Sequence, residues 1–297
     1  MRKILVVFAG MLYPFCAIWA QLEPPNEAGV SLSHWHTVVT DVDASRKFWI
    51  AMGGTPLKID GTEVVKFPGV FVFLTPGSPK GGSFGAAINH VGFTVSDDEA
   101  LVEKLKAAGM TAEYVTSVFT GNYLGWAYTP DNLKIEIGVN KSQPVPLAVP
   151  HVHMWMVQFD MKEAQTWYVK MFGGQPAPGT NGLRVTGIPG VSLIMANSED
   201  PRGQTPRSVG LIHGQLPAPD SPLVTALRNP PVPTKGRTLD HVGFEVKNLE
   251  AFCKKLEANG VKFDKPYSKT RFKSFASAEF TDPWGSSIEL TEGLGRF

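Results

Sequence analysis

Four stretches of the chain begin with the same arrangement of apolar and polar residues. They are SHWHTVVTD from Ser33, NHVGFTVSD from Asn89, PHVHMWMVQFD from Pro150 and DHVGFEVKN from Asp240. Short runs rich in apolar, β-branched and aromatic residues predict strands. Each run then passes through an Asp- or Asn-containing turn into a pattern with helical spacing. The chain is therefore expected to contain four units that each begin with a strand and a helix.

Each helical pattern ends at a glycine, the residue that best adopts the left-handed conformation just beyond a helix. The predicted helices cover residues 44–52, 99–108, 162–172 and 249–259, and the glycines are Gly53, Gly109, Gly173 and Gly260. Further strand-like runs follow at residues 70–74, 133–137, 191–195 and 287–290. Strand, helix and several strands per unit predict an α+β fold.

The units alternate in type, which suggests a two-unit domain that was duplicated. Units one and three share an HxH start and a later PGV, whereas units two and four share HVGF and a later Ile-Glu pair. We expect a first paired-module domain over residues 33–141, a linker over 142–150 and a second paired-module domain over 151–297. A Pro- and Gly-rich insertion covers about 197–238, and residues 21–32 form a leader.

The N-terminus has the layout of a secretory signal peptide. Arg2 and Lys3 precede an apolar stretch that ends near Ala20, after which we expect cleavage. An uncleaved anchor is less well supported, because the stretch is interrupted by Pro14 and is short for a span of about 20 residues. The sequence thus predicts an exported protein, periplasmic or secreted, that contacts no membrane after cleavage.

The charge and cysteine content limit the partners of the mature chain. Removing residues 1–20 leaves 26 basic and 27 acidic residues, a net charge of −1, which argues against nucleic acid as a partner. Only Cys253 remains, so no intramolecular disulfide can form.

The repeated motifs resemble those of the vicinal oxygen chelate superfamily, which contains glyoxalases, bleomycin-resistance proteins and extradiol dioxygenases. The likeness rests on the two HVGF segments, the helices that close at glycine, and TPDNLKIEI and TDPWGSSIEL at Thr129 and Thr281. It implies βαβββ modules that pair into cupped sheets, each holding a metal or a ligand. The expected fold is therefore four such modules in two cupped-sheet domains.

The histidines and glutamates of the repeats are the candidate metal ligands. Residues two apart in a strand project to one face, so the two histidines of each HxH motif point together. If consecutive modules pair, the resemblance implies one site from His34, His90 and Glu136 and another from His151, His241 and Glu289. Two imidazoles and one carboxylate suit Fe(II) and are compatible with Mn, Zn or Ni. We expect His36 and His153 to support these sites or to pack beside them.

The residues that complete the chemistry are harder to assign. No acid lies in the late strands of units one and three, which weakens a glyoxalase assignment, and Glu279 stands where extradiol dioxygenases have a tyrosine. Glu279, Tyr128 and His213, which lies in the insertion, are the candidate catalytic residues. Packing roles for Tyr128 and a solvated loop position for His213 are the competing interpretations.

Together, these features predict a divalent-metal-dependent enzyme that acts on a small substrate with vicinal oxygens, as a dioxygenase, lyase or isomerase. The alternative is a metal-free protein that binds a small molecule, as bleomycin-resistance proteins do. Exposed sheet edges would also be compatible with a homodimer.

Overall fold

The computed structural model describes residues 22–116, 123–157, 160–179, 182–197 and 231–297. They form four βαβββ modules, as predicted. The first contains β1 (Val30–Val39), α1 (Val42–Ala51), β2 (Thr55–Ile59), β3 (Thr62–Phe67) and β4 (Val70–Pro76). The second contains β5 (Ile88–Val95), α2 (Asp98–Ala107), β6 (Thr111–Thr116), β7 (Tyr123–Tyr128) and β8 (Lys134–Val139).

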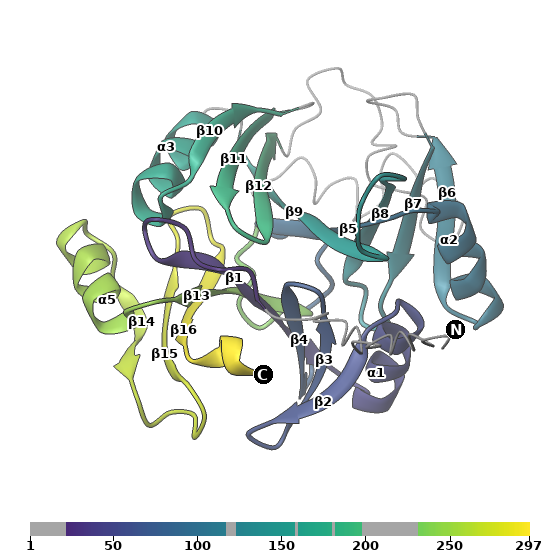
Figure 1. The fold of residues 1–297 in the computed structure, drawn as a ribbon, viewed down its shortest axis with the longest axis horizontal. Helices are drawn as coiled ribbons and strands as arrows, with labels where there is room; N and C mark the ends of the chain where they lie inside the picture. The colour runs from purple at the N-terminus through teal and green to yellow at the C-terminus, as the bar shows by residue number, and fades with distance from the viewer. Residues whose placement is uncertain (1–21, 117–122, 158–159, 180–181, 198–230) are drawn as a thin grey trace, which may run out of the picture.

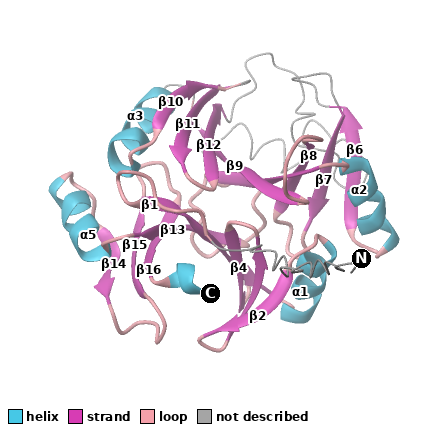
Figure 2. Cartoon of the chain, in the orientation of Figure 1, coloured by secondary structure: helices cyan, strands magenta, loops and turns pink. Residues whose placement is uncertain are grey.

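The second half of the chain repeats this order. The third module contains β9 (Leu147–Met156), α3 (Met161–Phe172), β10 (Gln175–Pro178), β11 (Gly182–Ile188) and β12 (Val191–Asn197). The fourth contains β13 (Leu239–Val246), α5 (Leu249–Ala258), β14 (Phe263–Ser268), β15 (Ala276–Thr281), β16 (Ser287–Glu292) and the 3-10 turn η3 (Leu294–Arg296). In the described part of the chain the strands occupy the middle of the molecule, and α1, α2, α3 and α5 lie at its periphery (Figures 1 and 2).

The helices lie where the sequence predicts them, and their ends have local causes. Asp41, Asp97 and Asn248 each accept a hydrogen bond from a backbone N–H in the first turn, which caps α1, α2 and α5. All four predicted terminating glycines have positive φ, between 71° and 108°: Gly53, Gly109, Gly173 and Gly260.

The pairing of the modules differs from the expectation. One eight-stranded sheet has the order β14-β15-β16-β13-β1-β4-β3-β2, so it joins the first and fourth modules. The other has the order β10-β11-β12-β9-β5-β8-β7-β6 and joins the second and third (Figure 1). Each sheet therefore contains strands from both sides of the 142–150 linker, and the expected pairing of consecutive modules is wrong.

Both pairings satisfy the same local rule, which is why the sequence did not distinguish them. In either arrangement, a strand that begins with HxH lies antiparallel to a strand that begins with HVGF, here β1 with β13 and β5 with β9. The two HVGF segments are identical, so either can serve either partner.

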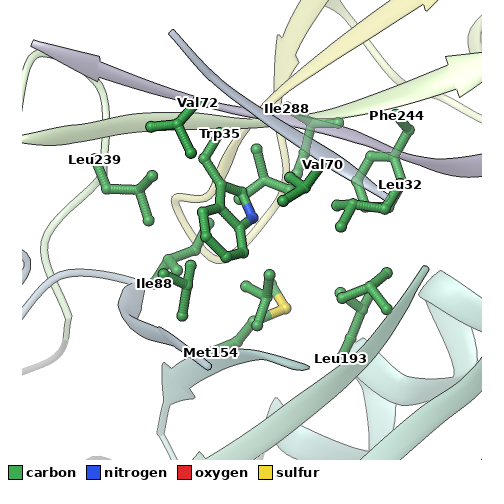
Figure 3. Close-up of a cluster of buried hydrophobic side chains, with 14 of the residues drawn as sticks. Leu32, Trp35, Val70, Val72, Ile88, Met154, Leu193, Leu239, Phe244 and Ile288 are labelled. Atoms are coloured by element: carbon green, nitrogen blue, oxygen red, sulfur yellow. The ribbon is translucent and has the colours of Figure 1, made fainter. Parts of the chain in front are cut away.

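One continuous apolar core lies between the two sheets. It combines side chains of the first sheet, including Leu32, Trp35 and Phe244, with side chains of the second, including Met154 and Leu193 (Figure 3). The fully buried indole of Trp35 contacts the ring of Phe93 edge to face, with 5.2 Å between the ring centroids. The two sheets are therefore expected to unfold together.

No helix among the described ranges is long and apolar enough to cross a bilayer. The predicted signal peptide and most of the insertion, including His213, lie outside the described residues.

Trp35→Ala tests the shared core. Because the indole is buried between the sheets, its removal is expected to lower the free energy of unfolding by about 3–5 kcal/mol. Urea unfolding followed by far-UV circular dichroism should still show a single transition. Ile50→Ala, at an exposed position of α1, is the control and should cost less. Two separate unfolding transitions, only one of which shifts in Trp35→Ala, would contradict a common core.

Candidate metal centres

The first sheet brings three histidines and a glutamate together on one face. His34 and His36 come from β1, His241 from β13 and Glu289 from β16, and their candidate ligand atoms all lie within 4.8 Å of one another. Oε2 of Glu289 lies 3.1 Å from Nε2 of His34 and 3.2 Å from Nε2 of His241. We call this set the first centre.

The second sheet carries the equivalent set, which we call the second centre. It consists of His90 from β5, Glu136 from β8, and His151 and His153 from β9. Oε2 of Glu136 lies 3.1 Å from Nε2 of His90 and 3.7 Å from Nε2 of His151. Nδ1 of His153 lies 3.0 Å from Nε2 of His90.

The six residues proposed from the sequence all lie in these two centres, but in exchanged groups. Because the first module pairs with the fourth, His34 meets His241 and Glu289 instead of His90 and Glu136. His151 correspondingly joins the second centre. His36 and His153 belong to the centres as well, because they project to the same face as the first histidine of each HxH motif.

A glycine across the strand pair makes room for one imidazole in each centre. Gly243 lies opposite His34, and Gly92 lies opposite His151. A Cβ atom at Gly243 would come within 2.0 Å of His34 Cε1, and one at Gly92 within 2.4 Å of His151 Cε1. The glycine of each HVGF motif is therefore required by the histidine ring that packs over it.

The directions of the histidine side chains also depend on bulges in the two central strand pairs. The register between β1 and β13 shifts at Ser33 and again at Asp240, and the register between β5 and β9 shifts at Asn89 and before His151. Such bulges change the direction of the next side chain. They place each candidate ligand histidine on the face opposite the inter-sheet core.

Most of these imidazoles are held neutral by burial. Burial lowers the pKa of His34, His151 and His153, and it lowers the pKa of His90 to about 4 against the opposing effect of Glu136. Burial and the neighbouring His241 lower the pKa of His36 to about 3. Neutral imidazoles offer a nitrogen lone pair, as a metal ligand must.

His241 is the exception. Burial lowers its pKa, but hydrogen bonds and attraction from Asp240 and Glu289 outweigh burial and raise the pKa to about 9. Both glutamates remain ionised: burial raises their pKa, but the surrounding histidines hold the pKa of Glu136 and Glu289 below the ordinary value. Each centre thus combines an anionic carboxylate with neighbouring imidazoles.

The geometry fits a small divalent ion. Ligands about 2.0–2.1 Å from a tetrahedral metal are separated by about 3.3 Å, close to the 3.0–3.7 Å between donor atoms of the second centre. Two of the buried imidazole nitrogens in the second centre have no hydrogen-bond partner: Nε2 of His151 and Nε2 of His153. Orphaned nitrogens beside a carboxylate are what a metal would satisfy.

Two of the three candidate catalytic residues are described, and neither is suited to proton exchange near neutral pH. Tyr128 donates a hydrogen bond to Glu113, and burial together with Glu113 raises its pKa. Glu279 is 1% exposed and forms ion pairs with Lys235 and Lys265. Burial raises its pKa, but the two lysines outweigh burial, so the Glu279 pKa is lowered.

The second centre has a buried lysine that sequence reasoning missed. Lys134 lies two residues before Glu136 on β8, is 1% exposed, and holds Nζ 3.7 Å from the centroid of the Trp126 ring. Burial lowers its pKa to about 7, although Glu136 and Glu113 oppose that shift. The alternation of β8 places Lys134 and Glu136 on one face, and this spacing was the available signal.

Comparison with known proteins agrees with this architecture. Residues 149–290 match the family model of the Glyoxalase/Bleomycin resistance protein/Dioxygenase superfamily. No significant match was found among curated protein sequences.

Solved structures show the same fold across nearly the whole chain. Glyoxalase I from Zea mays superposes with a TM-score of 0.64 at 16% identity, over 90% of this chain and 94% of that chain. A putative dioxygenase from Bacillus subtilis subsp. subtilis str. 168 gives a TM-score of 0.57 at 14% identity, over 89% of this chain and 85% of that chain. The chain therefore has the vicinal oxygen chelate fold, which confirms the resemblance inferred from its repeats.

Gly243→Ala tests the packing of the imidazole over the glycine. The added methyl group would overlap the His34 ring, so we expect a loss of about 1–3 kcal/mol in the free energy of unfolding, measured in urea with EDTA present. Gly138→Ala on β8 is the matched control, because its Cβ would meet no atom closer than 3.7 Å. Equal stability of the two variants would contradict this role of Gly243.

Proposed function

We propose that the protein is a divalent-metal-dependent enzyme of the glyoxalase or extradiol dioxygenase type that acts on a small substrate with vicinal oxygens. The observation that carries the proposal is the duplicated set of buried histidines and a glutamate, with all candidate ligand atoms of a set within 4.8 Å of one another. The matching superfamily model and the shared fold support it.

The chain's own residues would hold the metal and leave room for the substrate. In the first centre His34, His241 and Glu289 would bind it, and in the second His90, His151 and Glu136, with His36 and His153 beside them. A divalent ion with open coordination positions would bind the adjacent oxygens of a substrate and polarise them. Imidazole and carboxylate ligands suit Fe(II) and also accept Mn, Zn or Ni.

The second centre has the additional groups that a polar substrate would meet. Glu136 is 22% exposed at its side chain, compared with 5% for Glu289. Lys134 lies on the same strand face as Glu136, and in its protonated form it would favour an anionic substrate oxygen. An acidic or ionisable diol, hydroxy acid or keto acid is therefore the substrate class that this centre fits best.

Metal content tests the proposal directly. The mature protein, purified without oxygen and with iron supplied, is expected to contain up to two equivalents of divalent metal. His241→Ala should remove the equivalent at the first centre and His90→Ala the equivalent at the second, because each deletes one imidazole from a different set. The measurement is elemental analysis by mass spectrometry.

The alternative, a metal-free binding protein, predicts a different result. Such a protein would contain no stoichiometric metal, and both variants would retain the affinity of the wild type for its small-molecule ligand. That outcome would exclude the metal-dependent enzyme. Ser142→Ala, an exposed substitution that belongs to neither centre, controls for losses during purification.

Removal of the metal should lower the stability of the fold. An ion that binds only the native state at 100 times its Kd adds about 2.7 kcal/mol to the free energy of unfolding. We therefore expect EDTA to lower the Tm of the wild type in calorimetry. The double variant His241→Ala/His90→Ala serves as the control, and its Tm should not respond to EDTA; an equal response in both proteins would show that EDTA acts elsewhere.

A further inference from the structure

The two centres differ in the residues that lie behind their histidines. A metal-bound imidazole usually donates its other ring N–H to an outer partner, which fixes the tautomer and the ring orientation. In both centres the nitrogen lone pair needed for the metal exists only if the opposite nitrogen carries the proton. The groups that hydrogen-bond to the outer nitrogens, here called outer partners, therefore decide whether each imidazole turns a free lone pair toward the metal position.

Every histidine of the first centre has such a partner. Nδ1 of His241 donates to Oδ1 of Asp240 at 2.6 Å, and Oγ of Ser33 lies 2.9 Å from Nδ1 of His34. Nε2 of His36 lies 2.7 Å from Oγ1 of Thr75. Asp240 is itself held by the backbone N–H of Gly236, at 2.6 Å.

Among the described residues of the second centre, only His90 has an equivalent partner, the side-chain oxygen of Asn89 at 2.9 Å from Nδ1. The residue before His151 is a proline, which has no side-chain hydrogen-bonding group. Ala196 on β12 is the equivalent of Thr75 on β4. Each lies six residues after the glycine of its PGV motif. Nε2 of His153 is correspondingly buried without a partner.

Burial separates the centres in the same direction. The side chains of His34 and Glu289 are 1% and 5% exposed, whereas those of His151 and Glu136 are 9% and 22% exposed. The carboxylate of the first centre is thus more shielded from water, so its attraction for a cation is screened less.

We propose that Ser33, Thr75 and Asp240 make the first centre the tighter metal site, so that the two centres fill in a fixed order, the first before the second. This inference rests on the proposed function, since it assumes that both sets bind a divalent ion. The second centre, with fewer outer partners and a more exposed carboxylate, exchanges its ion more readily.

Single-centre variants allow each affinity to be measured alone with Co²⁺, whose visible absorption reports binding. His90→Ala leaves the first centre and His241→Ala leaves the second. We expect the Kd for Co²⁺ in His90→Ala to be at least about tenfold lower than in His241→Ala, the usual size of an outer-partner effect.

Thr75 supplies the sharper test, because its hydroxyl can be removed with little change of shape. In the His90→Ala background, Thr75→Val is expected to raise the Kd for Co²⁺ by about tenfold, whereas Thr75→Ser, which keeps the hydroxyl, should retain the original Kd. Thr186→Val, at a threonine on β11 in the second sheet, is the matched control and should leave the Kd unchanged.

The outcomes separate the inference from the proposed function. Absence of Co²⁺ binding in both single-centre variants would overturn the proposed function and the inference with it. Binding in both, with equal affinities or with the second centre tighter, would overturn only the order of filling. An equal loss of affinity in Thr75→Val and Thr75→Ser would show that Thr75 acts through packing and not through its hydroxyl, which would also overturn its assigned role.

Discussion

The close approach of an imidazole ring to a glycine across each central strand pair is the constraint on which both centres depend. His34 packs over Gly243 and His151 over Gly92, at distances that exclude any Cβ atom. Because these contacts join strands of different modules, neither centre is complete within one module. The pairing of the first module with the fourth, and of the second with the third, therefore decides which ligands meet.

Strand alternation then separates the chemistry from the core. Trp35 lies between His34 and His36 on β1, and its ring enters the apolar core between the sheets while the histidines face away from it. The same core stabilises both sheets, so both centres rest on one scaffold. The bulges at Ser33, Asn89 and Asp240 are needed because a regular strand would not place both the core residues and the histidines correctly.

The sequence was sufficient for the local structure and for naming the histidines and glutamates that gather in the two centres. Repeated motifs located the modules and placed the helices within about two residues of their observed bounds. The grouping of ligands could not be predicted, since the HVGF segments that receive His34 and His151 are identical. The role of Thr75 was equally hidden, because it depends on a contact between β1 and β4 that no short motif encodes.

The repeated architecture does not make the two centres equivalent. The ligand positions are set by strand register and by the glycines, which the two sheets share. The outer positions are occupied by Ser33, Thr75 and Asp240 in the first sheet. In the part of the second sheet that the structure describes, Asn89 is the outer hydrogen-bonding partner and Ala196 stands in place of Thr75. Strong outer hydrogen bonds favour retention of an ion, whereas an exposed carboxylate favours access by solvent and small ligands. One fold can therefore hold two similar sets of side chains, one suited to retaining an ion and the other to admitting solvent and small ligands. Burial and control of the imidazole tautomers are the physical variables that separate them.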